Sequence, residues 1–137
     1  MRRLLVALLA LSLLAVPVAF AAKLKSPKKA HVGDSVTANA SGLKAGRYAL
    51  TLASDSTPGP RAACVARVAG LKRAVDGKVE LTGDIPAHVR CWENNSVKLG
   101  RVKVTPGAYH LIVAKPDGPS GFDAQHSFVR RALTIKR

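Results

Sequence analysis

The fold of this chain is decided by the stretch Gly46-Arg47-Tyr48-Ala49-Leu50-Thr51-Leu52-Ala53. Residues 107–114 repeat its pattern, Gly-x-Tyr-x-Leu-x-(Leu/Val)-Ala. In each copy the glycine permits a turn, and three side chains then point inward at two-residue intervals. The predicted core therefore contains Tyr48, Leu50, Leu52, Tyr109, Leu111 and Val113. Because two copies are too few for a repeat architecture, we interpret the pattern as one device used twice in a single domain.

Alternation of apolar and polar residues continues along the rest of the chain, at 36–41, 64–68, 79–81, 102–104 and 129–135. Arg131 interrupts the last run, which indicates a bulge or an edge strand. Turn signals separate the runs: Gly33-Asp34, Ser41-Gly42, Thr57-Pro58-Gly59-Pro60, Asp76-Gly77, Gly83-Asp84 and Thr105-Pro106-Gly107. Short strands at this spacing predict an all-β protein, an antiparallel sandwich or barrel of seven to nine strands.

The first 21 residues have the layout of a secretory signal peptide. A basic start at Arg2 and Arg3 precedes an almost unbroken apolar run over 4–16, then Pro17 and the small-residue pattern Ala19-Phe20-Ala21. We expect cleavage after Ala21, which would leave residues 22–137 as one secreted or periplasmic domain. The alternative is an uncleaved membrane anchor, since the apolar run approaches the length of a membrane span.

Cys64 and Cys91 are the only cysteines of the 137-residue chain. Export would place them in an oxidising compartment, where an even number of cysteines favours a disulfide. Their separation matches no metal-ligand or redox motif. The sequence therefore predicts one structural bridge, buried between strands.

The first half of the domain resembles secreted bacterial immunoglobulin-like domains. The resemblance rests on Ser26-Pro27, Val32-Gly33-Asp34-Ser35-Val36, Ser41-Gly42-Leu43 and Gly46-Arg47-Tyr48, with Thr105-Pro106-Gly107-Ala108-Tyr109 as a later strand entry. Within that group it is similar to the neocarzinostatin-type apoprotein layout, in which a Gly-Leu-x-x-Gly turn precedes a strand. Those apoproteins carry two disulfides, whereas this chain can form one. The resemblance implies a single immunoglobulin-like antiparallel β-sandwich and transfers no ligand-binding residues.

The chain is strongly basic, with 22 Lys and Arg against 8 Asp and Glu and a formal net charge of +14. Loss of residues 1–21 would remove Arg2 and Arg3 and leave +12. Such a charge favours encounter with anionic partners, and an exported protein meets envelope polymers and lipid surfaces. Nucleic acid is disfavoured, because only 4% of the residues are aromatic. The alternative is a basic surface that only keeps the protein soluble.

One basic group is the preferred candidate for a specific anion contact: Lys98, Arg101 and Lys103. Alternate residues of a strand share a face, and a bulge at Gly100 is needed to present this group together. Trp92 follows Cys91, so it should face away from a core-facing Cys91. It is either an exposed contact for a ligand or partner, or a rim residue covered by the loop at 93–96.

Catalytic, cofactor and metal sites are not predicted. The four histidines show no metal-ligand spacing, and the sole Met is Met1. The cluster around Ser120, Asp123 and His126 lacks a nucleophile elbow and is interpreted as an ordinary loop. Three hypotheses remain, in this order: a non-enzymatic exported binding or structural module at the cell envelope, a small-ligand carrier with a cleft in the sandwich, and a cryptic hydrolase. An apolar pocket lined by Trp92 and the loop at 54–62 would favour the carrier.

Overall fold

The computed structural model describes residues 22–94, 96–116 and 129–137. The predicted signal peptide and the cluster around Ser120, Asp123 and His126 lie outside these residues. The described chain forms ten strands: β1 (Lys23–Lys25), β2 (Lys29–Ala30), β3 (Ser35–Ser41), β4 (Arg47–Ser54), β5 (Ala62–Arg73), β6 (Val79–Asp84), β7 (His88–Glu93), β8 (Val97–Lys103), β9 (Gly107–Ala114) and β10 (Val129–Ile135). No helix occurs in these ranges, so the predicted all-β class is confirmed.

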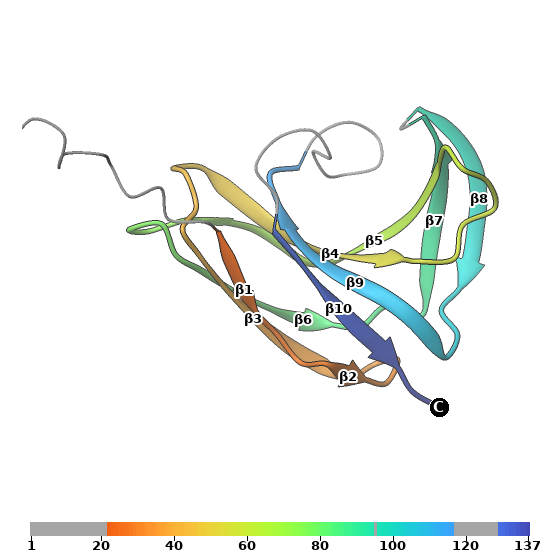
Figure 1. The fold of residues 1–137 in the computed structure, drawn as a ribbon, viewed down its shortest axis with the longest axis horizontal. Helices are drawn as coiled ribbons and strands as arrows, with labels where there is room; N and C mark the ends of the chain where they lie inside the picture. The colour runs from red at the N-terminus through yellow and green to blue at the C-terminus, as the bar shows by residue number, and fades with distance from the viewer. Residues whose placement is uncertain (1–21, 95, 117–128) are drawn as a thin grey trace, which may run out of the picture.

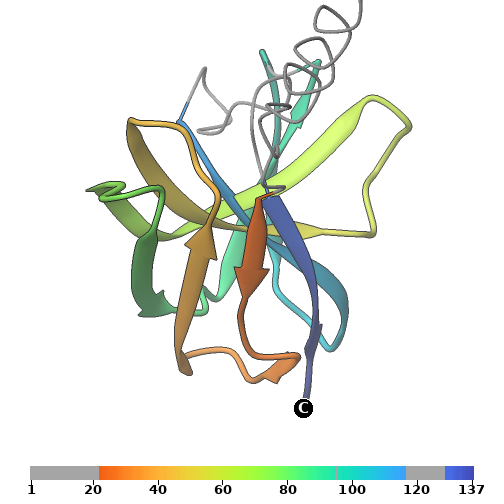
Figure 2. The same cartoon turned by 60° about the vertical axis from the view of Figure 1, so that its left-hand side comes forward.

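The strands form two sheets that face each other as a sandwich (Figures 1 and 2). The smaller sheet has the order β1-β3-β6, and the larger has the order β2-β10-β9-β4-β5-β7-β8. The count exceeds the seven to nine strands predicted, because the lysine-rich segment at 23–30 contributes two very short strands. β2 also pairs with β10 in parallel, through Lys29 with Thr134 and Ala30 with Ile135. The sandwich is therefore not purely antiparallel, and tertiary pairing rather than local alternation creates β1 and β2.

The two similar stretches become neighbouring strands at the centre of the larger sheet. Thr51 pairs with Ile112, the equivalent residue of the second copy, while Leu50 pairs with Val113 and Leu52 with Leu111. β4 and β9 are thus related by a local two-fold axis through the pair Thr51–Ile112. All six residues of the predicted core are buried, which confirms that prediction.

Each copy also uses its tyrosine to close the turn before the strand. The Tyr48 hydroxyl donates a hydrogen bond to the carbonyl of Lys44 at 2.8 Å. The Tyr109 hydroxyl accepts one from the backbone N–H of Thr105 at 3.1 Å. Both bonds span four residues, and the intervening glycines, Gly46 and Gly107, have φ values of 151° and 152° that L side chains rarely adopt. This is the logic of a tyrosine corner, in which a buried ring fixes the backbone a few residues upstream.

The prediction of a turn at Gly83-Asp84 is wrong. Both residues belong to β6, and a Cβ at Gly83 would lie 1.9 Å from the carbonyl oxygen of Val68 in β5. Glycine is needed because the backbones of the two sheets meet at this point.

Arg131 marks an edge rather than a bulge, since β10 pairs with β9 without interruption. Its side chain is half-buried and donates a hydrogen bond to the carbonyl of Leu24 in β1 at 3.1 Å. β1 and β10 lie side by side where the two sheets approach (Figure 2). β1 and β10 are not paired by backbone hydrogen bonds, so the Arg131 side chain links the two sheets at this edge.

Tyr48→Phe should lower the free energy of unfolding at neutral pH by about 1 kcal/mol, because the Lys44 carbonyl loses its donor. Burial raises the pKa of the Tyr48 phenol above its ordinary value. The unfolded chain therefore ionises first as the pH rises, so wild-type stability should fall from about pH 10 upward and less steeply in the variant. Denaturant unfolding at neutral and alkaline pH measures both effects. If the free energy of unfolding fell equally steeply with pH above about 10 in the wild type and the variant, the role assigned to Tyr48 would be contradicted.

Candidate functional site

The β7–β8 hairpin stands at one end of the molecule and presents two chemically distinct faces (Figure 1). Its inner face carries the pairs Val89–Val102, Cys91–Gly100 and Glu93–Val97. Its outer face carries the pairs His88–Lys103, Arg90–Arg101 and Trp92–Lys98. Apolar residues thus dominate one side, and basic residues with the single tryptophan occupy the other.

A bulge produces this separation. The register shifts between Cys91 and Trp92, so that Cys91 pairs with Gly100 while Trp92 pairs with Lys98. Leu99 is the extra residue, and Gly100 beside it has a φ of 127°. Without the bulge, Lys98 would face the opposite side from Arg101 and Lys103, because side chains alternate along a strand. The structure therefore places the three residues on one face of the hairpin.

A groove lies on the inner side of the hairpin, opposite the β4–β5 loop. It consists of a larger cavity of about 810 Å³ and a smaller one of about 340 Å³, which share Pro58 and Val102. The lining combines apolar and polar residues. The apolar ones include Pro58, Pro60, Ala62, Val89, Leu99, Val102 and Tyr109, and the hydroxyl residues Ser54, Ser56, Thr57 and Thr105 line the smaller cavity. Charged residues are few: Arg61, Glu93 and Arg101 border the larger cavity and Lys103 the smaller one. Each cavity has the size of a small-molecule site.

The disulfide Cys64–Cys91 forms part of this groove and confirms the predicted bridge. The two cysteines lie directly opposite each other on β5 and β7, with Cα atoms 3.9 Å apart. Both are buried in the core, yet Cys91 borders the larger cavity and Cys64 the smaller one. The bridge therefore fixes the hairpin to β5 at the base of the groove.

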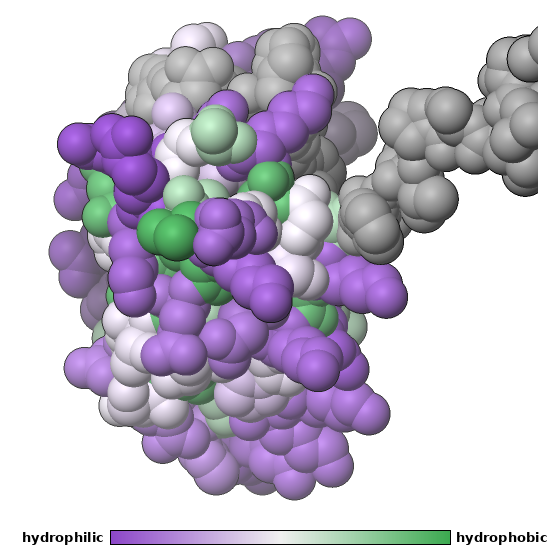
Figure 3. Space-filling model, turned by 90° about the vertical axis from the view of Figure 1, so that its left-hand side faces the viewer, coloured by the Kyte–Doolittle hydropathy of each residue, from purple (hydrophilic) through white to green (hydrophobic). Residues whose placement is uncertain are grey.

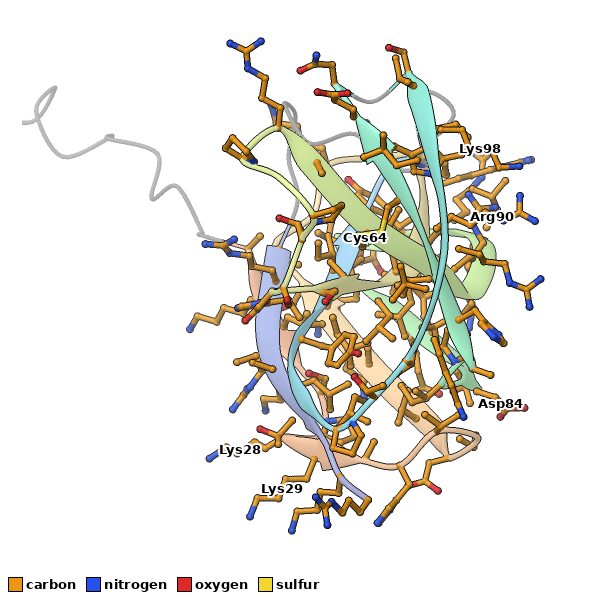
Figure 4. All side chains as sticks on the ribbon, turned by 90° about the vertical axis from the view of Figure 1, so that its right-hand side faces the viewer. Lys28, Lys29, Cys64, Asp84, Arg90 and Lys98 are labelled. Carbon is orange, nitrogen blue, oxygen red and sulfur yellow. A yellow bond between two sulfur atoms is a disulfide. The ribbon has the colours of Figure 1, made fainter. Side chains whose placement is uncertain are left out.

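The outer side of the same hairpin carries a shallow hollow of about 440 Å³, the outer hollow. It is lined by Val65, Ala66, Arg67, Pro86, Ala87, His88, Arg90, Trp92 and Arg101. Arg101 donates a hydrogen bond from Nη2 to Nδ1 of His88 at 3.1 Å. Since arginine can only donate, His88 Nδ1 must be the acceptor. Lys98 and Arg90 project from one side of the molecule, away from the interior in which Cys64 lies (Figure 4).

A second basic hollow lies between the start of the domain and the β5–β6 turn, and we call it the N-terminal hollow. Its volume is about 680 Å³, and its charged lining is Lys23, Lys25, Lys72, Arg73, Lys78 and Glu80. Lys72 is held by a hydrogen bond from Nζ to the carbonyl of Glu80 at 3.0 Å. The end of the molecule at which the β5–β6 turn projects has a largely hydrophilic surface (Figure 3). Basic residues distant in sequence thus gather on one surface.

A pocket lined by both Trp92 and the loop at 54–62, which would have favoured a carrier, is not found among the described residues. Trp92 is half-buried in the outer hollow, whereas residues of that loop line the groove. The two lie on opposite faces of the hairpin because Trp92 and Cys91 are neighbours on one strand. Arg101, on the outermost strand, borders both the outer hollow and the larger cavity of the groove. Of the other two basic residues predicted as an anion contact, Lys103 borders the smaller cavity of the groove, and neither Lys98 nor Lys103 lines the outer hollow. Arg67, Arg90 and His88 were not singled out as site residues by sequence reasoning, since cross-strand register brings them together.

Two histidine–aspartate pairs lie outside the groove and both hollows. Nδ1 of His110 lies 2.5 Å from the Asp55 carboxylate, and Nδ1 of His31 lies 3.3 Å from that of Asp34. The backbone N–H of His31 donates to the Asp34 carboxylate, which lowers the pKa of Asp34. Across the described ranges, no three His, Cys, Asp or Glu residues gather as a metal site, and no helix is long and apolar enough to cross a membrane.

Comparison with known proteins gives a likeness of fold. The chain is similar to the solved structure of macromomycin, with a TM-score of 0.54 and 16% sequence identity over 85% of this chain and 100% of that chain. This supports the resemblance to the neocarzinostatin-type layout at the level of fold. No protein-family model and no curated protein matches the sequence. Membership of the secreted bacterial immunoglobulin-like domains therefore stays a prediction.

Replacing both cysteines, Cys64→Ala with Cys91→Ala, should lower the free energy of unfolding by about 3–4 kcal/mol in the chain-entropy model. Thermal unfolding with and without a reductant measures the effect. Wild-type protein should lose a similar amount of stability on reduction, while the double variant should not respond to the reductant. An unchanged melting temperature of fully reduced wild-type protein would contradict a stabilising bridge.

Proposed function

We propose that this protein is an exported, non-enzymatic carrier that binds a small, mostly apolar molecule in the groove between the β7–β8 hairpin and the β4–β5 loop. The observation that supports it is the groove itself: two adjoining cavities of about 810 and 340 Å³ whose lining combines apolar side chains with hydroxyl and charged groups. Natural ligand sites are concave, mainly apolar and of this size, with a few polar groups for orientation.

Exposed apolar side chains add a second argument. Leu99 and Val102 are large hydrophobic residues that border the larger cavity while remaining about half exposed, at 46% and 51%. Covering them with a ligand would remove apolar surface from water, at roughly 25 cal/mol for each Å² buried. The disulfide and the Pro58-Gly59-Pro60 segment stiffen the two walls, so that a ligand would meet a largely preformed site.

Val102→Asp provides the sharpest test, because Val102 borders both cavities and its exposure keeps the cost to folding low. Leu71→Asp is the matched control: Leu71 is 52% exposed and lines none of the cavities described above. Nile red, a neutral apolar dye, serves as the probe. We expect Val102→Asp to weaken dye binding at least about tenfold and Leu71→Asp less than about twofold.

Dye fluorescence titrations measure these affinities, and thermal unfolding verifies that both variants stay folded. The absence of saturable dye binding to wild-type protein would refute an apolar carrier site. Equal losses in the two variants would also count against the groove.

We propose, as a second candidate function, that the basic surface associates with anionic components of the cell envelope. Supporting it are the net charge of +14, the N-terminal hollow with one acid among its charged lining residues, and the outer hollow without any. Charge of this kind accelerates encounter but gives little selectivity.

The three basic groups Lys23–Lys29, Lys98–Lys103 and Arg130–Arg137 should be neutralised separately to test this association. Binding to anionic vesicles and to wall polymer should be measured at low salt and at about 0.5 M, where screening removes long-range attraction. We expect the largest loss from the Lys98–Lys103 group. Equal small losses from all three would indicate a surface that only confers solubility.

A further inference from the structure

We infer that the outer hollow is a discrete binding site for an acidic pyranose saccharide, a sugar ring that carries a carboxylate. This inference deepens the second proposed function by naming the ligand class, and it is independent of the apolar groove. The observation behind it is a set of opposed basic residues on the outer face of the β7–β8 hairpin.

Like charges face each other across the outer side of the hairpin. Arg90 and Arg101 are directly opposite residues of β7 and β8, and the flanking pairs are His88–Lys103 and Trp92–Lys98. Directly opposed like charges destabilise a strand pair. No acid lines the outer hollow within the described part of the chain. A bound anion would relieve this repulsion, so the same arrangement that costs stability in the free protein favours an anionic ligand.

The geometry of the basic groups suits a carboxylate. Arg67, Arg90 and Arg101 line one concave surface from three neighbouring strands, β5, β7 and β8. The planar guanidinium matches a carboxylate through two parallel hydrogen bonds, which a lysine ammonium cannot reproduce. His88 accepts a hydrogen bond from Arg101 and thereby orients that guanidinium. The hollow is therefore more than a general accumulation of charge.

Trp92 supplies the second element of recognition. It is half-buried and lines the hollow beside the arginines. An indole ring offers a flat apolar face, and the C–H-rich face of a pyranose ring packs well against such a surface. A simple inorganic anion would leave this face uncovered. The combination of an aromatic face and arginines in one hollow favours a ring that carries charge.

A lipid surface fits less well. The outer hollow is concave, and its apolar lining consists of buried or half-buried residues and small ones, such as Val65, Ala66 and Ala87. Stable peripheral anchoring also requires apolar groups that insert below the headgroups. We therefore commit to a saccharide, and binding to lipid becomes an outcome of the test.

The test uses purified protein and four probes: an oligogalacturonate, a neutral maltooligosaccharide of equal length, poly(glycerol phosphate) and phosphatidylglycerol vesicles. Oligogalacturonate carries both sugar rings and charge, the maltooligosaccharide carries only the rings, and poly(glycerol phosphate) carries only the charge. The vesicles test the lipid alternative. Trp92 is the sole tryptophan, so intrinsic fluorescence reports on the outer hollow directly. We expect a saturable change with oligogalacturonate that persists in part at about 0.5 M salt, where diffuse attraction is screened.

Arg90→Gln is the informative variant, because Arg90 lines the outer hollow and not the groove. Arg130→Gln is its matched control, an exposed arginine on β10 with three strands between it and β7. We expect at least about a tenfold loss of oligogalacturonate affinity for Arg90→Gln and less than about twofold for the control. Trp92→Leu, measured by calorimetry, should also weaken binding about tenfold.

Four outcomes would overturn the inference. Equal losses in Arg90→Gln and Arg130→Gln, or equal affinity for poly(glycerol phosphate), would reduce the interaction to diffuse charge and leave general envelope association standing. Arg90-dependent binding to vesicles without binding to oligogalacturonate would assign the hollow to lipid. No binding of any polyanion at low salt would remove both this inference and the second proposed function. None of these results bears on the proposed carrier function, which the Nile red assay tests separately.

Discussion

The structure depends on the pairing of β4 with β9, two strands built from eight-residue stretches that follow one pattern and share four residues. Their shared glycine and tyrosine fix each strand at its entry, because the buried ring is held by a hydrogen bond to the backbone four residues upstream. The local two-fold axis through Thr51 and Ile112 then sets the register of the apolar side chains of β4 and β9. A slip of one residue would turn these side chains to the opposite face of the sheet, so the hydrophobic core and the hydrogen-bonded turns reinforce one arrangement.

From this centre the larger sheet extends through β5 to the β7–β8 hairpin, where the candidate sites lie. β5 is a 12-residue strand, and its first four residues, 62–65, pair with β7 and so carry the hairpin. The disulfide attaches β7 to β5, and the bulge at Leu99 rotates the end of β8. Together they separate an apolar face from a basic one on a hairpin only two strands wide. Two ligand chemistries can therefore be offered within a few residues without a second domain.

The two faces differ in what a ligand would contribute. In the groove, half-exposed hydrophobic residues lie beside a rigid disulfide, and the gain on binding is the removal of apolar surface from water. On the outer side the free protein holds opposed arginines, and the gain would be relief of electrostatic repulsion together with directed hydrogen bonds. The likeness to macromomycin is one of fold and indicates no ligand, because a β-sandwich hosts many functions.

The all-β class, the six core residues and the disulfide could be predicted from the sequence, because each depends on local information. Two-residue alternation shows which side chains share a face, and two cysteines in a chain with a predicted export signal have one possible intramolecular pairing. Other features could not be predicted. Gly83 reads as a turn signal because nothing nearby in sequence indicates that Val68 would come within contact of its backbone. The strands β1 and β2 exist only because β3 and β10 offer edges to pair with. The outer hollow likewise needs β5, β7 and β8 in register before Arg67, Arg90 and Arg101 meet around Trp92. Periodicity fixes the side of a strand on which a residue lies, whereas long-range pairing alone decides which residues become neighbours.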